Sequence, residues 1–281
     1  MAIWRKGEVV VLNWLEDRLG GKEYQLVAYI KALSLLVLCR CAFNRVIWVR
    51  HNAKPHKSVN SFLYTSLIFF LKNISHACVT HREVEGINSL YVPHPLYYVN
   101  RIGVGKDSHV NYLIFGRIEK YKGIVELLEV WPSDSQLRIL GRSVDKKLTD
   151  EILEVISRRR LNVIWKNEFI DSIELGAEIE SSKCVVIPNS SETMYVSGVF
   201  FHALSFNKPV LVRNGNFYRC YLEKFGCFGS FELDSLKEDV ENYDVESVEG
   251  GVRRAAAMHN DSECFRYWFK VISSGETDSI G

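Results

Sequence analysis

The chain of 281 residues is 47% hydrophobic and 25% charged, which is typical of a globular protein large enough for one large or two modest domains. The net charge is only +1, but residues 1–105 hold 13 Lys/Arg and 6 Asp/Glu while the rest of the chain holds 22 and 28, so the basic first half favours an anionic partner. Seven scattered cysteines, no signal-peptide pattern and apolar runs no longer than 62–71 argue against a secreted or membrane-spanning protein and predict a cytoplasmic one.

Apolar runs of strand length alternate with longer helical runs along the first hundred residues. Parallel α/β sheets are built from this alternation, and they bind ligands at the carboxyl ends of their strands. Polar and histidine-rich segments follow the expected strands, which predicts a binding edge there. We expect strands at 8–13, 45–50, 76–80 and 89–92, with helices at 22–43 and 61–71.

The alternation restarts after a linker at 104–107 and weakens after Gly215. The sequence therefore predicts a first domain at 1–105, a second at 106–260 and a C-terminal helix and polar tail at 261–281. In the second domain we expect strands at 110–115, 137–140, 162–165, 184–187 and 210–212. The expected helices are at 123–130, 146–159, 172–181, 199–206, 217–224, 236–243, 252–258 and 264–272.

Two loops of the second domain combine features of phosphate sites. Arg117 and Lys122 lie on one loop between a strand and a helix, where a guanidinium fork and a mobile ammonium can reach the same anion. Ser197 and Gly198 open a helix after another strand, where unpaired N–H groups and the helix dipole favour an anion. A solvated basic loop and an ordinary N-cap are the alternatives, but two such loops in one domain favour a shared pyrophosphate site.

The first domain offers acids and histidines at its expected strand ends. Glu16, a candidate general base, follows the first strand, and its alternative is an acid at a helix start. His51 and His56 flank a proline-containing loop with Asn52, which makes a binding or catalytic role about as expected as a structural one. His94 lies between two prolines and is expected to shape the binding surface.

The sequence resembles a known family in these segments. GRIEKYKG (116–123), LRILGR (137–142) and the stretch 187–212 look like the donor-binding half of GT-B glycosyltransferases, with the closest likeness to the family 4-like enzymes that build bacterial exopolysaccharide or capsule. NWLED (13–17), VRHNAKPHK (49–57) and YVPHPLY (91–97) are similar to the tryptophan-acid, HNxxPH and PHxxY segments of those enzymes. The likeness covers most of residues 8–212.

The resemblance implies an α/β protein of GT-B fold, with two Rossmann-like domains whose parallel sheets face across a cleft and a short first domain. The first domain would bind the acceptor and the second the nucleotide sugar. Arg117 and Lys122 match the family's pyrophosphate-binding pair, and Ser197 and Gly198 match the helix start under the diphosphate. Glu192 and His202 are expected to contact the donor as well.

The activity implied is transfer of a hexose from a UDP- or GDP-sugar to a glycan acceptor carried on a polyprenyl diphosphate, at the inner face of the plasma membrane. No metal and no cofactor are expected, because no DxD-type carboxylate pair is present and the nucleotide sugar is a co-substrate. The acid-free stretch 24–82 is basic and suits contact with anionic lipid headgroups.

A second reading is a non-catalytic GT-B homologue or subunit that binds a nucleotide sugar or a partner transferase. The family's second glutamate is absent, because the residue eight positions after Glu192 is Phe200 and His202 is the nearest polar residue. The first domain is also shorter than in relatives. A nucleic-acid-binding protein is a third reading, which we set aside because no nucleic-acid-binding motif is present.

Overall fold

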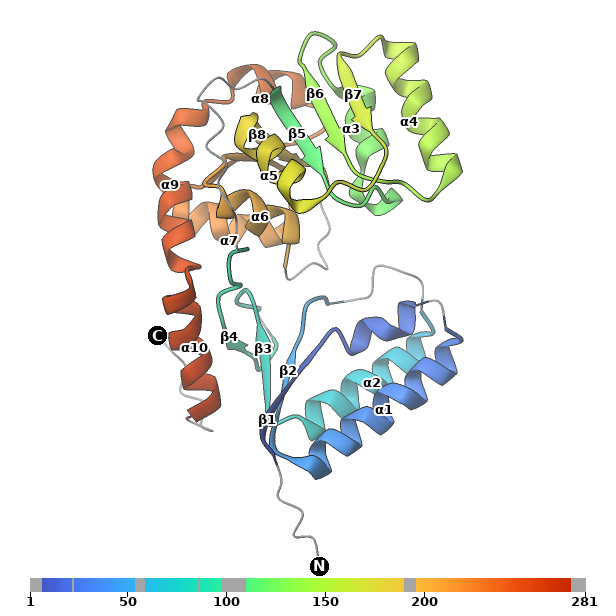
Figure 1. The fold of residues 1–281 in the computed structure, drawn as a ribbon, viewed down its shortest axis with the longest axis vertical. Coiled ribbons are helices and arrows are strands. Elements are labelled where there is room, and N and C mark those ends of the chain that lie inside the picture. The colour runs from blue at the N-terminus through green and yellow to red at the C-terminus, as the bar shows by residue number, and fades with distance from the viewer. Residues whose placement is uncertain are drawn as a thin grey trace, which may run out of the picture. The chain divides into compact units, whose positions relative to one another are not determined.

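The structure, a computed structural model, describes residues 7–21, 23–53, 59–84, 86–97, 110–189 and 196–273 (Figure 1). Contacts divide the chain into two compact units. The first comprises the described residues of Met1–His94, Thr193–Val196 and Ser262–Gly281, and the second those of Pro95–Glu192 and Ser197–Asp261.

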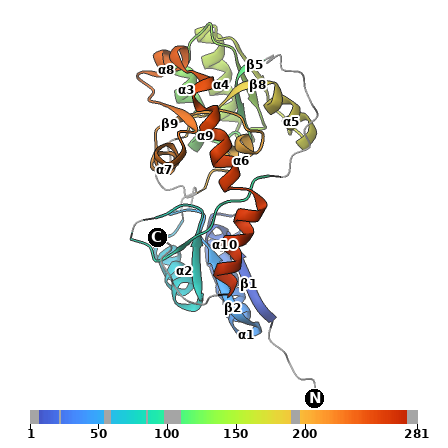
Figure 2. The same cartoon turned by 90° about the vertical axis from the view of Figure 1, so that its left-hand side faces the viewer.

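The first unit is built on a parallel sheet in the order β1-β2-β3-β4. Helices α1 and α2 lie side by side on one face of the sheet, and α10 covers the other (Figures 1 and 2). The strands are β1 (Gly7–Asn13), β2 (Phe43–Val49), β3 (Ala77–Thr80) and β4 (Leu90–Tyr91), and the helices are η1 (Glu16–Gly20), α1 (Gln25–Ala42), α2 (Ser61–Ile74) and α10 (Asp261–Ser273).

Side-chain periodicity explains these two layers. Successive side chains of a strand point to opposite faces, so Val46 and Trp48 of β2 pack under α1 and α2, while Ile47 and Val49 pack with α10. The buried residues of α1 recur every three or four positions and form one helical stripe against the sheet: Ala28, Ala32, Leu36 and Cys39.

The second unit is built on a parallel sheet in the order β10-β9-β8-β5-β6-β7. Its strands are β5 (Val110–Phe115), β6 (Leu137–Leu140), β7 (Val163–Lys166), β8 (Ser182–Ile187), β9 (Val210–Arg213) and β10 (Phe228–Phe231). Its helices are η2 (Lys120–Lys122), α3 (Ile124–Val130), α4 (Lys146–Arg159), α5 (Ser172–Ser181), α6 (Gly198–Ser205), α7 (Asn216–Phe225), α8 (Leu236–Asn242) and α9 (Val245–Met258).

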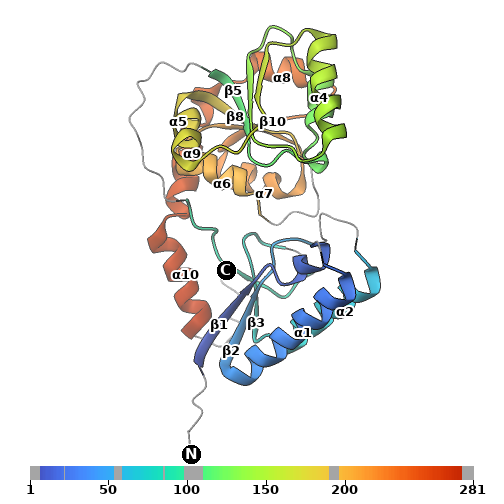
Figure 3. The same ribbon diagram turned by 45° about the vertical axis from the view of Figure 1, so that its right-hand side comes forward.

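Helices cover both faces of this sheet. The apolar sides of α3, α4 and α8 form one core with the strands, and α5 and α6 pack on β8 from the opposite face (Figure 3). Helix starts are set by side-chain caps: Asp145 accepts from Leu148 N at the start of α4, and Asp171 accepts from Ile173 N and Glu174 N at the start of α5.

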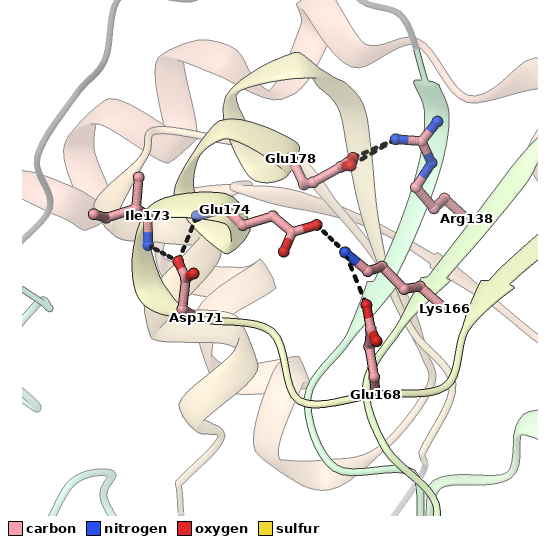
Figure 4. Close-up of polar contacts among 7 residues, drawn as sticks. All are labelled: Arg138, Lys166, Glu168, Asp171, Ile173, Glu174 and Glu178. Carbon is pink, nitrogen blue, oxygen red and sulfur yellow. Dashed lines mark hydrogen bonds and ion pairs between the residues drawn. The ribbon is translucent and has the colours of Figure 1, made fainter.

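Ion pairs attach α5 to the neighbouring strands, as Figure 4 shows. Arg138 of β6 makes two hydrogen bonds to the Glu178 carboxylate, at 2.7 and 2.6 Å. Lys166 of β7 pairs with Glu168 at 3.0 Å and also with Glu174. Both basic side chains are only partly exposed, so these contacts fix the position of α5 against β6 and β7.

The structure differs from the sequence-based expectations at several places. Helix α9 begins at Val245, seven residues before the expected start, and β10 was not expected at all. The division falls after His94 and after Asp261, which places the C-terminal helix α10 in the first unit. The linker expected at 104–107 lies outside the described residues.

Helix α1 is unusually apolar. Among the described residues it is the one helix long and apolar enough to cross a membrane, with 18 residues and a mean hydropathy of 1.6. The apolar stretch expected from the sequence was shorter, at 33–39. The buried stripe of α1 packs on the sheet, so in this fold the helix forms one layer of a globular unit.

Candidate functional site

Two loops of the second unit meet at the carboxyl edge of its sheet. Strands β5 and β8 are parallel neighbours, so the loop after β5 and the start of α6 emerge at the same edge. Gly116, the first residue after β5, lies against α6, because a Cβ added to it would be 3.8 Å from Val199 Cγ2. The same Cβ would be 3.2 Å from Lys122 Nζ. The structure therefore brings Lys122 and the first turn of α6 together around Gly116.

Glycines make this close approach feasible. Gly116 has φ +95° and Gly141, after β6, has φ +143°, both in the region that side-chain-bearing residues rarely adopt. A Cβ on Gly141 would be 2.0 Å from the carbonyl oxygen of Gly116. A larger residue at 141 would push the loop after β5 out of place.

Lys122 is the buried cation of this edge. Its side chain is nearly inaccessible, and Nζ donates to the carbonyl oxygen of Phe115 at 3.4 Å. Burial lowers the pKa of Lys122 to about 8, because the charged ammonium has lost most of its water. A bound anion would restore the stabilisation that the ammonium has lost.

Arg117 lies on the same loop, but its side chain is 74% exposed. Its guanidinium pairs with Glu119 at 3.3 Å, an exposed contact of small energetic value. The guanidinium can therefore turn toward an anion at little cost.

Ser197 and Gly198 begin α6 as the sequence predicts. The Ser197 hydroxyl is buried, accepts from Phe200 N at 3.3 Å and lies 3.4 Å from the Tyr218 hydroxyl. Ser197 is thus an N-cap, and its hydroxyl engages the third N–H of the helix. The N–H groups of the first two helical residues remain at the end of the helix dipole, where an anion is favoured.

His202 lies on α6 within an aromatic group. Its ring stacks on Tyr97 with centroids 4.8 Å apart and meets Phe115 edge-on at 5.5 Å. Burial lowers its pKa, so the imidazole is neutral at physiological pH. The Tyr97 hydroxyl reaches the helix start, since it is 3.1 Å from the position of a Cβ on Gly198.

Phe200 occupies the α6 position at which the resemblance would place a second glutamate. Phe200 is buried and contacts the rings of Tyr218, Tyr221 and Phe228, so a carboxylate there would be inside the apolar core. Glu192 lies outside the described residues. His202, two positions further on in α6, has a half-buried polar side chain.

The first unit gathers polar residues at the carboxyl ends of its strands. Trp14, directly after β1, has φ +58°, a left-handed backbone that is rare for a bulky residue. Its indole is 47% exposed and stacks on His51 with centroids 3.7 Å apart and an interplanar angle of 4°. One face of the half-exposed indole thus packs on a buried imidazole.

His51 is held in a neutral state. Its Nε2 lies 3.2 Å from Asn13 Oδ1, and its Nδ1 has no hydrogen-bond partner among the described residues. Burial lowers the pKa of His51 to about 3, with additional contributions from His81 and His94. His81 follows in the same row, at 5.4 Å from His51 and 5.0 Å from His94.

Glu16 is fully buried beside His51. Its carboxylate accepts from Trp48 Nε1 at 2.9 Å and from the backbone N–H of His51 at 3.4 Å. Burial raises the pKa of Glu16 to about 7, because the charged form is poorly solvated. These contacts connect β2, the loop after it and η1, so Glu16 positions His51 in the fold.

Of the remaining predicted residues, the structure describes Asn52 and His94 but not His56. Asn52 is buried and donates to Asp17 Oδ2 at 3.2 Å, and its carbonyl oxygen accepts from Arg50 Nε. His94 is at the end of the histidine row. His56 lies outside the described residues. Among the residues that the structure describes, no group of three or more His, Cys, Asp or Glu is arranged to hold a metal ion.

Known proteins match this chain through structure alone. No family model and no curated protein sequence matches it. HepE of Anabaena, solved with UDP and glucose, superposes with a TM-score of 0.66 at 12% identity, over 88% of this chain and 76% of that one. Sucrose-phosphate synthase of Thermosynechococcus elongatus gives 0.65 at 13% identity, over 94% and 72%.

TarM of S. aureus, solved with fondaparinux, α-GlcNAc-glycerol and UDP, gives a TM-score of 0.60 at 13% identity. The match covers 83% of this chain but 51% of TarM, so the chain spans about half the length of that enzyme. These structures are GT-B glycosyltransferases. The chain has the GT-B fold.

Two residues of these edges were missed by sequence reasoning. Tyr97 was noted within a family-like segment but was not assigned to the donor side, although it lies along α6. Trp14 was noted in the same way, but its positive φ and its stacking on His51 have no sequence signal. An exposed tryptophan directly after a predicted strand is the feature that would have singled it out.

Proposed function

We propose that this chain is a glycosyltransferase that moves a sugar from a nucleotide sugar to a glycan acceptor. The observation that carries the proposal is the convergence of Lys122, the Arg117 loop and the first turn of α6 around Gly116. A buried cation, an exposed guanidinium and the first-turn N–H groups of a helix at one sheet edge suit a diphosphate.

The chemistry of transfer requires stabilisation of the leaving group. The acceptor oxygen forms a bond to the anomeric carbon, and the bond from that carbon to the diphosphate oxygen breaks with its electron pair. Negative charge then develops on the nucleoside diphosphate. Lys122 and the α6 N–H groups are preorganised to stabilise this charge, in a setting where Lys122 has already lost its water, and Arg117 can turn from Glu119 toward it.

Nucleotide identity is proposed from the same site and from the matched structures. HepE was solved with UDP-glucose as well as with UDP and glucose, which favours a UDP-sugar and a hexose for this chain. A GDP-sugar is the alternative. Glu192, which precedes α6 in the sequence, and His202, on α6 itself, are the proposed contacts to the donor sugar or ribose.

We assign acceptor binding to the first unit. Exposed Trp14 offers an aromatic face to the C–H face of a sugar, with the His51 ring stacked behind it. His51 is the proposed base for the acceptor proton, a role that requires its buried side chain to become accessible and its pKa to rise from about 3. Asn52, His56 and His94 complete the proposed acceptor side, and Glu16 holds His51 in position.

The proposed acceptor is a glycan on a polyprenyl diphosphate, and the proposed process is bacterial exopolysaccharide or capsule synthesis. The basic first half suits work beside an anionic membrane in the cytoplasm. Transfer without a metal is part of the proposal, because cationic side chains and helix N–H groups occupy the positions where a metal would neutralise the diphosphate.

A second candidate function is supported by one observation. The α6 position expected to hold a second glutamate is Phe200, buried in an aromatic core. A chain that binds the nucleotide sugar without turning it over would fit this change. The two functions agree on donor binding and differ on catalysis.

Isothermal titration with UDP, GDP, UDP-glucose and GDP-mannose tests the shared part of the proposal. We expect micromolar affinity for one nucleotide class and a loss of at least about tenfold in Lys122→Met, which keeps the volume and removes the charge. Arg117→Ala should weaken binding less, and Lys147→Ala, an exposed lysine of α4, should leave it unchanged. Absence of binding by the folded wild type would overturn the proposal.

Release of nucleoside diphosphate from the bound sugar nucleotide separates the two functions. The transferase proposal predicts turnover that rises when polyprenyl-diphosphate-linked saccharides are added, and that falls in Trp14→Ala and His51→Ala with unchanged nucleotide affinity. Tight binding without turnover under these conditions would favour the non-catalytic homologue.

A further inference from the structure

Helices α1 and α2 present an unusually apolar outer surface. We call it the α1–α2 face, and it comprises large side chains that are between 44% and 79% exposed: Val27, Ile30, Val37 and Leu38 of α1, and Phe62 and Phe69 of α2. On α1 they recur at the spacing of one helical side, opposite the buried stripe that packs on the sheet. A helix that faces water normally carries polar residues there.

The two helices form one continuous surface. They lie side by side on the same side of the sheet, with α1 and α2 in blue tones in Figures 1 and 3. Their shared core joins them, and the hydroxyls of Tyr29 and Ser66 bond across the helix pair at 2.7 Å. The exposed sides of both helices therefore adjoin each other.

The charge on this surface has one sign. Neither helix contains an Asp or Glu, and their cations Lys31, Arg40 and Lys72 are all exposed. Lys31 pairs with Glu23, which precedes α1, at 2.8 Å. Long basic side chains at the margin of an apolar surface can keep their charge among headgroups while their stems cover apolar area.

We propose that the α1–α2 face docks onto the surface of a lipid bilayer that contains anionic lipids. Exposed aliphatic and phenylalanine side chains would enter the boundary between headgroups and acyl chains, and Lys31, Arg40 and Lys72 would contact the anionic headgroups. The helix lies on the membrane and does not cross it, because its buried stripe is part of the core of the first unit.

Lipid is a better occupant than protein for this surface. Protein interfaces are depleted in lysine, whereas this surface has Lys31 and Lys72 beside its apolar side chains. The absence of acids on both helices gives charge complementarity to anionic lipid along the whole surface. The inference rests on these helices and does not require the proposed donor site to be correct.

Vesicle flotation with the full chain tests the proposal. Wild type should bind vesicles of phosphatidylcholine with phosphatidylglycerol, bind pure phosphatidylcholine much less, and lose affinity at high salt. The double variant Ile30→Gln/Phe69→Gln should bind at least about tenfold more weakly, and Arg40→Gln/Lys72→Gln should lose about fivefold per cation on anionic vesicles only.

A matched control uses exposed apolar residues of the second unit. Phe169→Gln/Ile173→Gln changes two exposed side chains near α5 and should leave vesicle binding unchanged. Circular dichroism and thermal unfolding confirm that each variant is folded, which is expected because all substitutions are at exposed positions.

Three outcomes would overturn the proposal. One is the failure of wild type to float with anionic vesicles, and another is an equal loss in the control variant. The third is self-association of the chain, measured by sedimentation equilibrium, that the Ile30→Gln/Phe69→Gln variant abolishes while no vesicle binding is seen. That result would make the α1–α2 face an interface between protein chains.

Discussion

Lys122 is a buried cation at the proposed diphosphate site. Its Nζ lies against Gly116 and the carbonyl oxygen of Phe115, and the absence of water lowers its pKa to about 8. At neutral pH the Lys122 ammonium is mostly charged, and above pH 8 it becomes mostly neutral in the free protein. In the proposed site a diphosphate would bind the charged ammonium, so its affinity should follow this titration.

We therefore expect the dissociation constant for the preferred nucleotide to rise about tenfold between pH 7 and pH 9, as the protonated fraction of Lys122 falls. Titration calorimetry across this range provides the measurement, and Lys122→Met should bind weakly with little pH dependence. An equal pH dependence in wild type and Lys122→Met would show that another group is responsible.

The raised pKa of Glu16 predicts that this residue lowers the folding stability as the pH rises. Its pKa is about 7 in the folded protein and 4.5 in the reference state, so the folded state holds its proton more tightly. The stabilisation is complete below pH 4.5 and is lost as the pH rises through 7. The shift corresponds to roughly 3 kcal/mol.

The comparison with Glu16→Gln isolates this effect. His51 and His81, whose pKa values are lowered by burial, act in the opposite direction over part of this range, but they are present in both proteins. Denaturant unfolding from pH 4.5 to pH 8 should show wild type losing stability relative to Glu16→Gln as the pH rises. Parallel curves would contradict an ionisable, buried Glu16.

At the residue level, the sequence allows the placement of loops at one sheet edge to be foreseen, while the roles of their residues stay predictions. Lys122, Ser197 and Gly198 lie together because parallel strands bring their loops to one edge, which the alternation of strands and helices makes foreseeable. Tyr97 could not be assigned to α6, since a separation of a hundred residues carries no local signal. Burial of Glu16 was equally hidden, because an acid after a strand is usually exposed.

At the scale of elements, α5 depends on charged contacts with β6 and β7. Arg138 bonds Glu178 through two contacts with limited exposure, whereas the i,i+4 pair Lys147–Glu151 of α4 is exposed and 3.8 Å apart. Charge-assisted, two-point hydrogen bonds retain more of their energy than exposed single contacts.

A pair of double-mutant cycles tests this difference. We expect a coupling of about 1 kcal/mol for Arg138–Glu178 and a value within about 0.5 kcal/mol of zero for Lys147–Glu151, from denaturant unfolding of single and double alanine variants. A coupling near zero for both pairs would mean that the Arg138–Glu178 contact does not stabilise the position of α5.

Sequence periodicity located most elements because apolar side chains repeat every two residues in these strands and every three or four in these helices. The start of α9 was misplaced because Gly250-Gly251 resembles a helix break. In the structure Asp244 caps the helix, and a Cβ on Gly251 would be 2.3 Å from the carbonyl oxygen of Gly226. Glycine is therefore needed for packing at 251. Strand β10 was missed because FGSF is short and contains a glycine.

At the scale of the whole molecule, the two halves have opposite charge, and we propose separate tasks for them. The basic first unit carries the α1–α2 face and the Trp14–His51 stack, and the second unit carries the proposed diphosphate site. The alternation of strands and helices made two parallel α/β domains foreseeable, and the GT-B fold was expected from the family resemblance of several segments. The assignment of α10 to the first unit was not, because its contacts with β2 and β3 link residues more than 190 positions apart.

The most direct test of the central claim is a crystal structure of the chain with UDP, or with GDP if that nucleotide binds more tightly. We predict a diphosphate within about 3.2 Å of Lys122 Nζ and of a backbone N–H in the first turn of α6, with Arg117 turned away from Glu119 toward the phosphate. A nucleotide bound elsewhere, with Lys122 still bonded only to Phe115, would contradict the account.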